Sequence, residues 1–231
     1  MVRLEGVVKR FGPIVALRGI DLQLQRGRCL GLFGPNGAGK TTLLKILATL
    51  TRPSAGTVWI AGHDAVRDAA QVRRMLGVLS HRTFLYGHLT AWENLRFYGR
   101  MFGLQRLPER IADVLQTVDL TAQAHQLVRT YSRGMQQRLA IARAILHAPA
   151  LLLLDEPYTG LDKHSASRLL VLLQQLRAEA CTIILSTHDW HGGFDFYDEV
   201  ALQCRGRMVY NGPASEIDVP GFEQLYNTYV G

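Results

Sequence analysis

The 231-residue chain predicts an α/β fold interrupted by a helical segment, and three observations support this prediction. A glycine-rich motif at residues 34–42 follows a short apolar run and precedes a segment with one apolar face, which is the order strand, loop, helix. A second apolar run, at residues 150–154, ends beside two acidic residues, as a buried parallel strand at a ligand site does. Between these motifs, residues 91–147 show helical periodicity and few strand signals.

The segment before the glycine-rich motif is expected to form strands. Residues 2–10 can form a first strand, which ends at a turn around Gly12. Residues 20–25 alternate apolar and polar side chains, as an edge strand of a partly solvated sheet does. Residues 29–33 read as a short buried strand that leads into the motif, and the helix of the motif is expected to start near Lys40.

Helices are expected to replace strands in the middle of the chain. Strands at residues 57–60 and 76–79 come first, with the end of a short helix at 72–75. Thr90 and Glu93 then form a capping box, Pro108 lies in the first turn of a second helix, and Ser132 caps a third. These three helices are expected at residues 91–101, 108–118 and 132–147.

The α/β pattern resumes at residue 150 and continues to the end of the chain. The expected elements are strands at 150–154, 182–186, 200–204 and 207–210, and helices at 165–178 and 223–229. We therefore expect a single domain over residues 1–231. In this domain, residues 1–80 and 150–231 supply the α/β core, and residues 81–149 form an inserted helical subdomain.

Composition narrows the classes of function. The net charge of +7 could suit nucleic acid or an anionic membrane, but the arginines are scattered, so a solvated basic surface is the favoured reading. The three cysteines lack metal-ligand spacing and are expected to be reduced core residues. No apolar run approaches the roughly 20 residues of a membrane span, and the first residues lack a signal-peptide core. We expect a cytosolic chain, or one held at a membrane by a partner.

The glycine-rich motif fits G-x-x-x-x-G-K-[ST], the phosphate-binding P-loop. Its residues are Gly34, Pro35, Asn36, Gly37, Ala38, Gly39, Lys40, Thr41 and Thr42. The glycines let successive N–H groups point inward as an anion nest, and the following helix adds the positive end of its dipole. Lys40 is expected to reach the β- and γ-phosphates, Thr41 to ligate Mg²⁺ and Thr42 to bond a phosphate oxygen. A chance glycine-rich turn would not show this strand-loop-helix context.

Asp155 and Glu156 follow the four leucines of the second motif, Leu151–Leu154. Ligands of open α/β sheets bind at the carboxyl ends of the strands. We expect Asp155 to hold Mg²⁺ through water and Glu156 to polarise the water that attacks the γ-phosphate. The alternative interpretation is that the two acids belong to a polar turn after the strand, since Pro157 comes next. The P-loop upstream favours a catalytic role for them instead.

These motifs together resemble the ATP-binding subunit of ABC transporters. The P-loop, the helical insert, the Ser-x-Gly-x-Gln element within residues 131–138 and the acidic strand end carry the resemblance, which covers nearly the whole chain. It implies a P-loop NTPase core with an antiparallel β subdomain and an inserted helical subdomain. It also implies ATP hydrolysis with Mg²⁺ and a dimer that holds two ATP molecules between its subunits. The membrane permease is then a separate protein, with this chain on the cytoplasmic face.

The resemblance also implies roles for single residues. Phe11 would stack on adenine, although a core phenylalanine at a strand end is the alternative. Ser132 and Gly134 would meet the γ-phosphate held by the other subunit, whether identical or different. Asp162 would lie at the subunit boundary, and His188 would contact the γ-phosphate rather than being a loop histidine without a role.

Two positions depart from the family pattern. Arg133 replaces a glycine of the signature and is expected to be solvent-exposed, the alternative being that it adds positive charge near phosphate. The glutamine usual after the strand at residues 76–79 is missing, and His81 or Arg82 stands in its place. One hypothesis is that His81 turns a neutral ring nitrogen toward the metal and its water. The alternatives are that Arg82 binds phosphate or that the loop only docks the permease.

The function expected from all this is an ATPase that energises export through a permease. Ser80–His81 and Leu95–Tyr98 look most like the haem exporter group of cytochrome c maturation, while drug, lipid and polysaccharide exporters carry similar ATPases. A soluble ABC-type ATPase acting on ribosomes or nucleic acid is disfavoured, because this chain has one cassette and no heptad run. The docking patch is expected between Arg82 and Leu107. Its centre would be Phe84, Leu85, Tyr86 and Trp92, unless these residues form the core of the helical subdomain.

Overall fold

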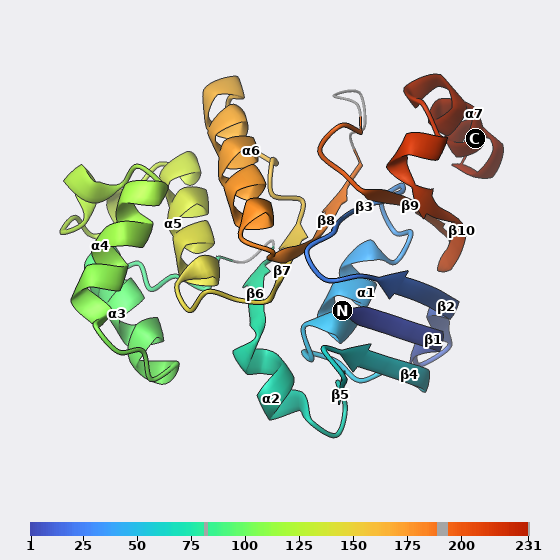
Figure 1. The fold of residues 1–231 in the computed structure, drawn as a ribbon, viewed down its shortest axis with the longest axis horizontal. Coiled ribbons are helices and arrows are strands. Elements are labelled where there is room, and N and C mark those ends of the chain that lie inside the picture. Colours follow the sequence, from blue (N-terminus) through green and yellow to red (C-terminus); the bar gives the residue numbers. More distant parts are fainter. Residues whose placement is uncertain (81–82, 189–193, 231) are drawn as a thin grey trace.

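The computed structural model describes residues 1–80, 83–188 and 194–230. A six-stranded sheet lies between a group of helices and a four-stranded sheet (Figure 1). The order of its strands is β10-β9-β3-β8-β7-β6, and all are parallel to their neighbours except β10. Their bounds are β3 Cys29–Phe33, β6 Leu76–Leu79, β7 Leu151–Asp155, β8 Thr182–Thr187, β9 Glu199–Cys204 and β10 Arg207–Pro213. The strands expected from the apolar runs are thus confirmed within one to three residues.

The four leucines of β7 show why this strand is apolar up to its last residue, Asp155. Leu151 and Leu153 pack with the P-loop helix α1, Lys40–Leu47, and with the four-stranded sheet. Leu152 and Leu154 pack on the other side, against the helices. All four are 1% exposed or less. A parallel strand covered on both faces needs apolar side chains at every position, not at every second one.

The smaller sheet has the order β2-β1-β4-β5 and is antiparallel throughout. Its strands are β1 Val2–Phe11, β2 Ile14–Leu24, β4 Ala55–Ile60 and β5 His63–Asp64. The edge position expected for the second strand is confirmed. The Arg18 N–H donates to the Gly206 carbonyl over 2.8 Å, which joins β2 to the turn between β9 and β10. The implied combination of a P-loop core with an antiparallel sheet is therefore present.

The helices are α2 Ala69–Arg74, α3 Ala91–Met101, α4 Leu107–Thr117, α5 Arg133–Ile145, α6 Lys163–Ala178 and α7 Val219–Val230, with single turns of 3-10 helix at Thr121–Gln123, Val128–Thr130 and Ala214–Glu216. The predicted capping box of α3 is confirmed. The Thr90 hydroxyl accepts from the Glu93 N–H over 3.1 Å, and the Glu93 carboxylate accepts from the Thr90 N–H over 2.8 Å. The Ser132 cap of α5 is confirmed too, with its hydroxyl accepting from the Met135 N–H over 3.3 Å.

Arg143 of α5 and His147, just after that helix, cover the open edge of the six-stranded sheet at β6. The Arg143 guanidinium donates to the Val78 carbonyl over 2.7 Å, and the His147 ring meets the Leu76 carbonyl over 3.0 Å. Burial lowers the pKa of His147 to about 4, so its ring is neutral at pH 7. These bonds satisfy edge carbonyls that no neighbouring strand reaches. They also set α5 against the strand that ends beside the P-loop.

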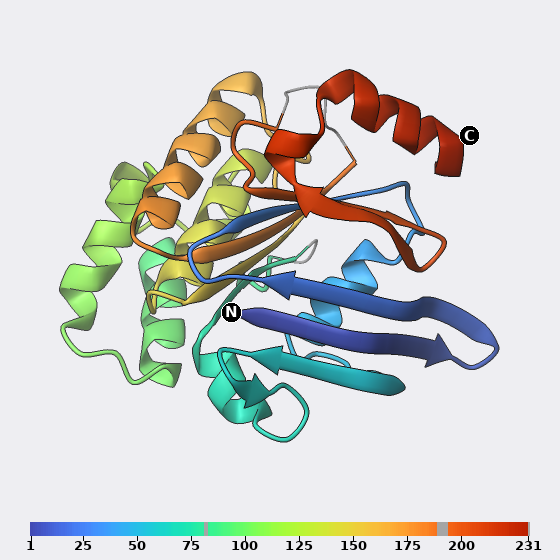
Figure 2. The same cartoon turned by 45° about the vertical axis from the view of Figure 1, so that its right-hand side comes forward.

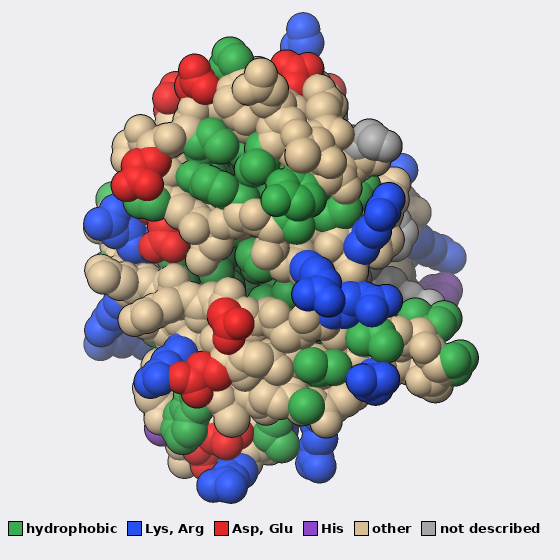
Figure 3. Space-filling view, turned by 90° about the vertical axis from the view of Figure 1, so that its right-hand side faces the viewer, with side chains coloured by type: hydrophobic (Ala, Val, Ile, Leu, Met, Phe, Trp, Pro, Cys, Tyr) green, Lys and Arg blue, Asp and Glu red, His purple; other side chains and the backbone are tan. Residues whose placement is uncertain are grey.

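Helix α7 starts earlier than expected because Asp218 caps it, accepting from the Gly221 N–H over 2.8 Å. It lies at the opposite end of the molecule from α3 and α4 (Figure 2). Figure 3 views the side of the molecule that lies on the right in Figure 1, and shows hydrophobic side chains gathered on its upper part, where α7 lies. Phe222 anchors the helix by packing its ring on Phe33 and Phe194. Within the described part of the chain, every helix is too short or too polar to cross a bilayer.

Candidate functional site

The P-loop connects β3 to α1 and has the backbone its motif predicts. Gly34 and Gly39 adopt φ values of 145° and 108°, which L side chains rarely reach. A Cβ on Gly34 would lie 2.1 Å from the Gln203 carbonyl oxygen, and one on Gly39 would lie 2.6 Å from the Gln203 amide nitrogen. Glycine is therefore required at both positions for conformation and for space.

Lys40 is buried at the start of α1 and faces two carboxylates. Its ammonium donates to the carbonyls of Gly34 over 2.5 Å and Pro35 over 3.3 Å, and lies 3.8 Å from Glu156 Oε1. Burial lowers the pKa of Lys40, while the charges of Glu156 and Asp155 act in the opposite direction. The side chain predicted to meet phosphates is thus already held beside the predicted catalytic acid.

Asp155 ends β7 between two hydroxyl donors. Ser186 Oγ donates to Asp155 Oδ1 over 2.6 Å, and Thr41 Oγ1 lies 3.2 Å from the same oxygen. The parallel register explains this arrangement, because Asp155 and Ser186 are paired across β7 and β8. A threonine hydroxyl beside a carboxylate is the oxygen-donor chemistry that Mg²⁺ prefers when phosphates complete its shell. Asp155 and Thr41 therefore fit the ion.

Glu156 adopts a left-handed backbone conformation, with φ 52°. Its N–H donates to the Ser186 carbonyl over 3.0 Å, and its Oε2 lies 2.9 Å from His188 Nδ1. A non-glycine residue held at positive φ stores strain of about 1 to 2 kcal/mol. His188 is 61% exposed yet contacts the acid, so it is not an isolated loop residue. Lys40, Thr41, Asp155, Glu156 and His188 thus form one contiguous group, called the carboxylate cluster below.

Phe11 is 49% exposed at the end of β1, which excludes the alternative of a core phenylalanine. Lys9 lies over its ring, with the ammonium 4.8 Å from the centroid. The same hairpin contacts the P-loop, because the carbonyl of Ala16 lies 2.8 Å from where a Cβ on Gly39 would be. An exposed aromatic ring is therefore presented by the strand pair that touches the phosphate loop.

The other implied residues are not bonded to the carboxylate cluster within the described part of the chain. Among the described residues, no hydrogen bond or ion pair joins Ser132, Gly134 or Asp162 to the cluster. Asp162 caps α6, accepting from the Ser165 N–H over 2.7 Å. Arg133 is exposed, as expected, and its guanidinium packs beside Gly160. His81 and Arg82 lie outside the described residues.

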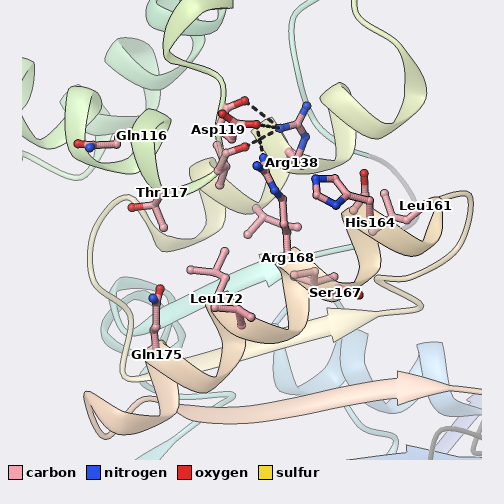
Figure 4. A pocket seen from close by; sticks show the side chains of 15 residues that line it. Gln116, Thr117, Asp119, Arg138, Leu161, His164, Ser167, Arg168, Leu172 and Gln175 are labelled. Atoms are coloured by element: carbon pink, nitrogen blue, oxygen red, sulfur yellow. Dashed lines mark hydrogen bonds and ion pairs between the residues drawn. The ribbon is translucent and has the colours of Figure 1, made fainter.

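Among the cavities of the described part of the chain, two lie beside the helices of the helical segment. One of about 560 Å³ is lined by Asp155 and Glu156 on one side and by Arg133, Gln136 and Gln137 at the start of α5 on the other. A groove of about 460 Å³ lies between α4, α5 and α6, and contains none of the carboxylate cluster (Figure 4). There Asp119 accepts from both Arg138 and Arg168, which joins the end of α4 to α5 and α6.

Sequence reasoning missed two residues of the site. Ser186 appeared only as the end of a strand, although a hydroxyl at the carboxyl end of a buried strand is a signal for a ligand edge. Gln203 is fully buried behind the P-loop. Its signal was a polar residue within the otherwise apolar segment Val200–Cys204.

Comparison with known proteins identifies the family. The family model described as ABC transporter matches residues 17–159. The chain is 37% identical to the daunorubicin resistance ATP-binding protein DrrA3 of Streptomyces coeruleorubidus, covering 94% of this chain and 69% of that protein. It is 36% identical to the Nod factor export ATP-binding protein I of Cupriavidus metallidurans, covering 94% and 72%.

Solved structures agree with these relatives. An ATP-binding subunit of an ABC transporter superposes with a TM-score of 0.90 over 100% of both chains, at 25% identity. The dimeric ATP-binding cassette MJ0796 bound to ADP and phosphate gives a TM-score of 0.85 at 28% identity, over 93% of this chain and 99% of that one. The chain therefore belongs to the ABC transporter family, as an ATP-binding subunit that hydrolyses ATP.

Proposed function

We propose that this chain is the ATPase of an exporter and acts on a separate permease at the cytoplasmic face of the cell membrane. The observation that carries this proposal is the carboxylate cluster, in which Lys40 and His188 hold Glu156 beside the Thr41–Asp155 pair. The names of the relatives, which refer to daunorubicin resistance and Nod factor export, favour a drug or a Nod-factor-like cargo over haem. Haem export, suggested by residues 80–81 and 95–98, has no support in these names.

The nucleotide would bind along the P-loop. The N–H groups of Gly34, of residues 36–39 and of the start of α1 would form the anion nest, with Thr42 in the first turn of the helix. Thr41 and Asp155 would hold Mg²⁺, which when bound neutralises charge on the phosphate oxygens. For His81, the third metal-binding candidate, the hypothesis that its ring faces the metal rests on the sequence alone. Its test is the Mg²⁺ concentration dependence of turnover in His81→Ala, which should shift if the ring meets the metal site.

Hydrolysis would depend mainly on positioning by Glu156. Its carboxylate orients a water toward the γ-phosphorus and takes up a proton as the new P–O bond forms and the bond to ADP breaks. The His188 ring holds one carboxylate oxygen at 2.9 Å and so restricts the directions the acid can take. Lys40 lies on the other oxygen at 3.8 Å, which places positive charge where the transferred group becomes more anionic.

Phe11→Ala should raise the KM for ATP by about tenfold and leave kcat within about twofold. Stacking of a base on an aromatic ring contributes about 1 to 3 kcal/mol, and this contribution acts on binding rather than on the reacting atoms. Steady-state ATPase kinetics measure both constants. Ile14→Ala, which changes the exposed residue paired with Phe11 across the hairpin, is the matched control. An unchanged KM in Phe11→Ala would mean that adenine stacks elsewhere.

A second subunit would complete each nucleotide site. Ser132 caps α5 and Gly134 lies in its first turn, whose free N–H groups can bind an anion, and no hydrogen bond or ion pair among the described residues joins these two residues to the carboxylate cluster. This arrangement fits a phosphate supplied by a partner's P-loop, with Asp162 at the boundary between subunits. We propose a dimer on this ground, and the test is analytical ultracentrifugation with and without ATP in the Glu156→Gln variant.

The permease is proposed to dock on an aromatic patch of the helical subdomain, residues 81–149, away from the core formed by residues 1–80 and 150–231. Phe84, Tyr86 and Phe97 are 41% to 49% exposed, and Tyr86 and Phe97 pack edge to face with ring centroids 5.2 Å apart. Leu85 and Trp92 instead pack against the buried core cluster. The expected patch is thus divided: two of its four residues are packed inward and two are available to a partner.

The test is affinity purification of the tagged chain from gently solubilised native membranes. A multi-helix permease should copurify, and Phe97→Ser should reduce its yield about tenfold, because exposed aromatic residues contribute most of the energy of such interfaces. Val171→Ser, an exposed apolar residue on α6, is the matched control. Equal yields with both variants would exclude the patch. If cytochrome-maturation proteins copurified, haem would again be the favoured cargo. If the chain were recovered with ribosomes or nucleic acid, the proposal that it drives export would be rejected.

A further inference from the structure

Gln203 is a buried polar residue whose side chain has no hydrogen-bond partner among the described residues. It lies on β9 with 0% exposure, and neither Oε1 nor Nε2 of its amide is hydrogen-bonded to any described residue. Leaving such a group unbonded in the interior costs about 1 to 3 kcal/mol. An apolar side chain of similar size would avoid this cost. A role outside the stability of the strand is therefore worth seeking.

The amide lies directly behind the P-loop. The side-chain amide nitrogen is 2.6 Å from where a Cβ on Gly39 would be, and the backbone carbonyl oxygen of Gln203 is 2.1 Å from where a Cβ on Gly34 would be. The turn after β9 is joined to the same loop, because the Gly206 N–H donates to the Ala38 carbonyl over 2.9 Å. Gln203 is thus the polar side chain that β9 presents to the back of the phosphate loop.

Lys40 is hydrogen-bonded to backbone carbonyls of the P-loop, and it would have to leave them when a nucleotide binds. Its ammonium is bonded to the Gly34 and Pro35 carbonyls, and Gly34 is buried. To meet the β- and γ-phosphates, the ammonium must give up at least part of these bonds. A buried carbonyl would then lose a charge-assisted hydrogen bond, at a cost that weakens nucleotide binding.

We propose that Gln203 is a positioning residue for the P-loop, whose amide bonds the loop backbone when Lys40 turns to the phosphates. The amide can both donate and accept, so it can replace the lysine at a carbonyl or receive a loop N–H. This proposal rests on the proposed role of Lys40 in binding phosphate. It adds a group that can replace the hydrogen bonds which the loop loses when Lys40 moves to the phosphates. The proposal also explains why the Gln203 amide occurs in an apolar strand. Its missing hydrogen bonds destabilise the nucleotide-free protein, but the amide stabilises the P-loop backbone once nucleotide is bound.

The test compares Gln203→Met with the wild-type chain, because methionine keeps the length and shape of the side chain and removes its hydrogen bonds. In the absence of nucleotide, the melting temperature should stay the same or rise. The Kd for Mg²⁺-ADP, measured by titration calorimetry, should increase about three- to tenfold, the worth of one hydrogen bond. The KM for ATP should increase by a similar factor, with kcat within about twofold.

Leu202→Met is the matched control, since its side chain belongs to the cluster around Phe33 on the other face of β9. It should leave the Kd unchanged. An unchanged Kd in Gln203→Met would overturn the proposal. So would a variant that is destabilised or unfolded without nucleotide, because the amide would then be a structural group. Failure of the wild-type chain to bind Mg²⁺-ADP would instead contradict the proposed nucleotide site itself.

Discussion

Glu156→Gln should reduce ATP turnover by at least about a hundredfold while leaving ATP affinity within about twofold. A positioned general base contributes about 10²- to 10⁴-fold to a rate, and an amide cannot take up the proton of the attacking water. Binding should survive because the change keeps the size of the side chain, and an amide can still bond His188. The two readouts are single-turnover hydrolysis and equilibrium binding of ATP in the presence of Mg²⁺.

Glu179→Gln serves as the matched control, because that residue is an exposed glutamate just after α6. It should change neither quantity. Loss of ATP binding together with turnover in Glu156→Gln would mean that the carboxylate is needed for the shape of the site. That outcome would point to the strained backbone at Glu156, with its bond to the Ser186 carbonyl, as the sensitive feature. Full retention of turnover would assign the base elsewhere.

Lys40→Met should lower ATP affinity by about tenfold or more and abolish measurable turnover at ordinary ATP concentrations. A hydrogen bond to a charged group contributes about 1.5 to 3 kcal/mol, and an ammonium on phosphate oxygens is of this kind. Methionine keeps much of the apolar stem that packs at the start of α1. The measurement is calorimetric binding of ATP and of ADP, with circular dichroism to confirm that the variant is folded.

The neighbouring Lys45 provides the control for charge alone, since it lies on the same helix and is exposed. Lys45→Met should leave affinity within about twofold. If both variants weakened binding equally, long-range attraction by the basic surface would explain the effect, and it would fade with added salt. Unchanged affinity in Lys40→Met would show that the bonds from Lys40 to the Gly34 and Pro35 carbonyls are its main role.

Local rules predicted many elements of this fold because they depend on neighbouring residues. The capping box at Thr90 and Glu93 and the cap at Ser132 concern groups three residues apart, so the sequence contains all of their chemistry. The P-loop is a similar case: its motif predicted the strand, the loop and the helix in order. The start of α7 escaped prediction because its cap, Asp218, stands several residues before the periodic segment.

Contacts between residues on different strands of the sheet could not be predicted from neighbouring residues in the sequence. Ser186 reaches Asp155 only because β7 and β8 are parallel neighbours in one register, and Gln203 reaches the P-loop only because β9 lies beside β3. Likewise, the division of the aromatic patch into packed and exposed residues depends on how α3 meets the core. Periodicity marks residues as apolar, but it does not say which apolar residues find a partner.

The amino-acid sequence was enough to predict a phosphate-binding loop, two acids at a strand end and the family to which these belong. Each of these signals lies within a few consecutive residues. The meeting of Lys40, Glu156 and His188 became visible only in the fold, as did the Gln203 amide behind the glycines, which is not hydrogen-bonded to any described residue. The physical reason is that these groups come from segments more than 30 residues apart, which only the order and register of the parallel strands bring together.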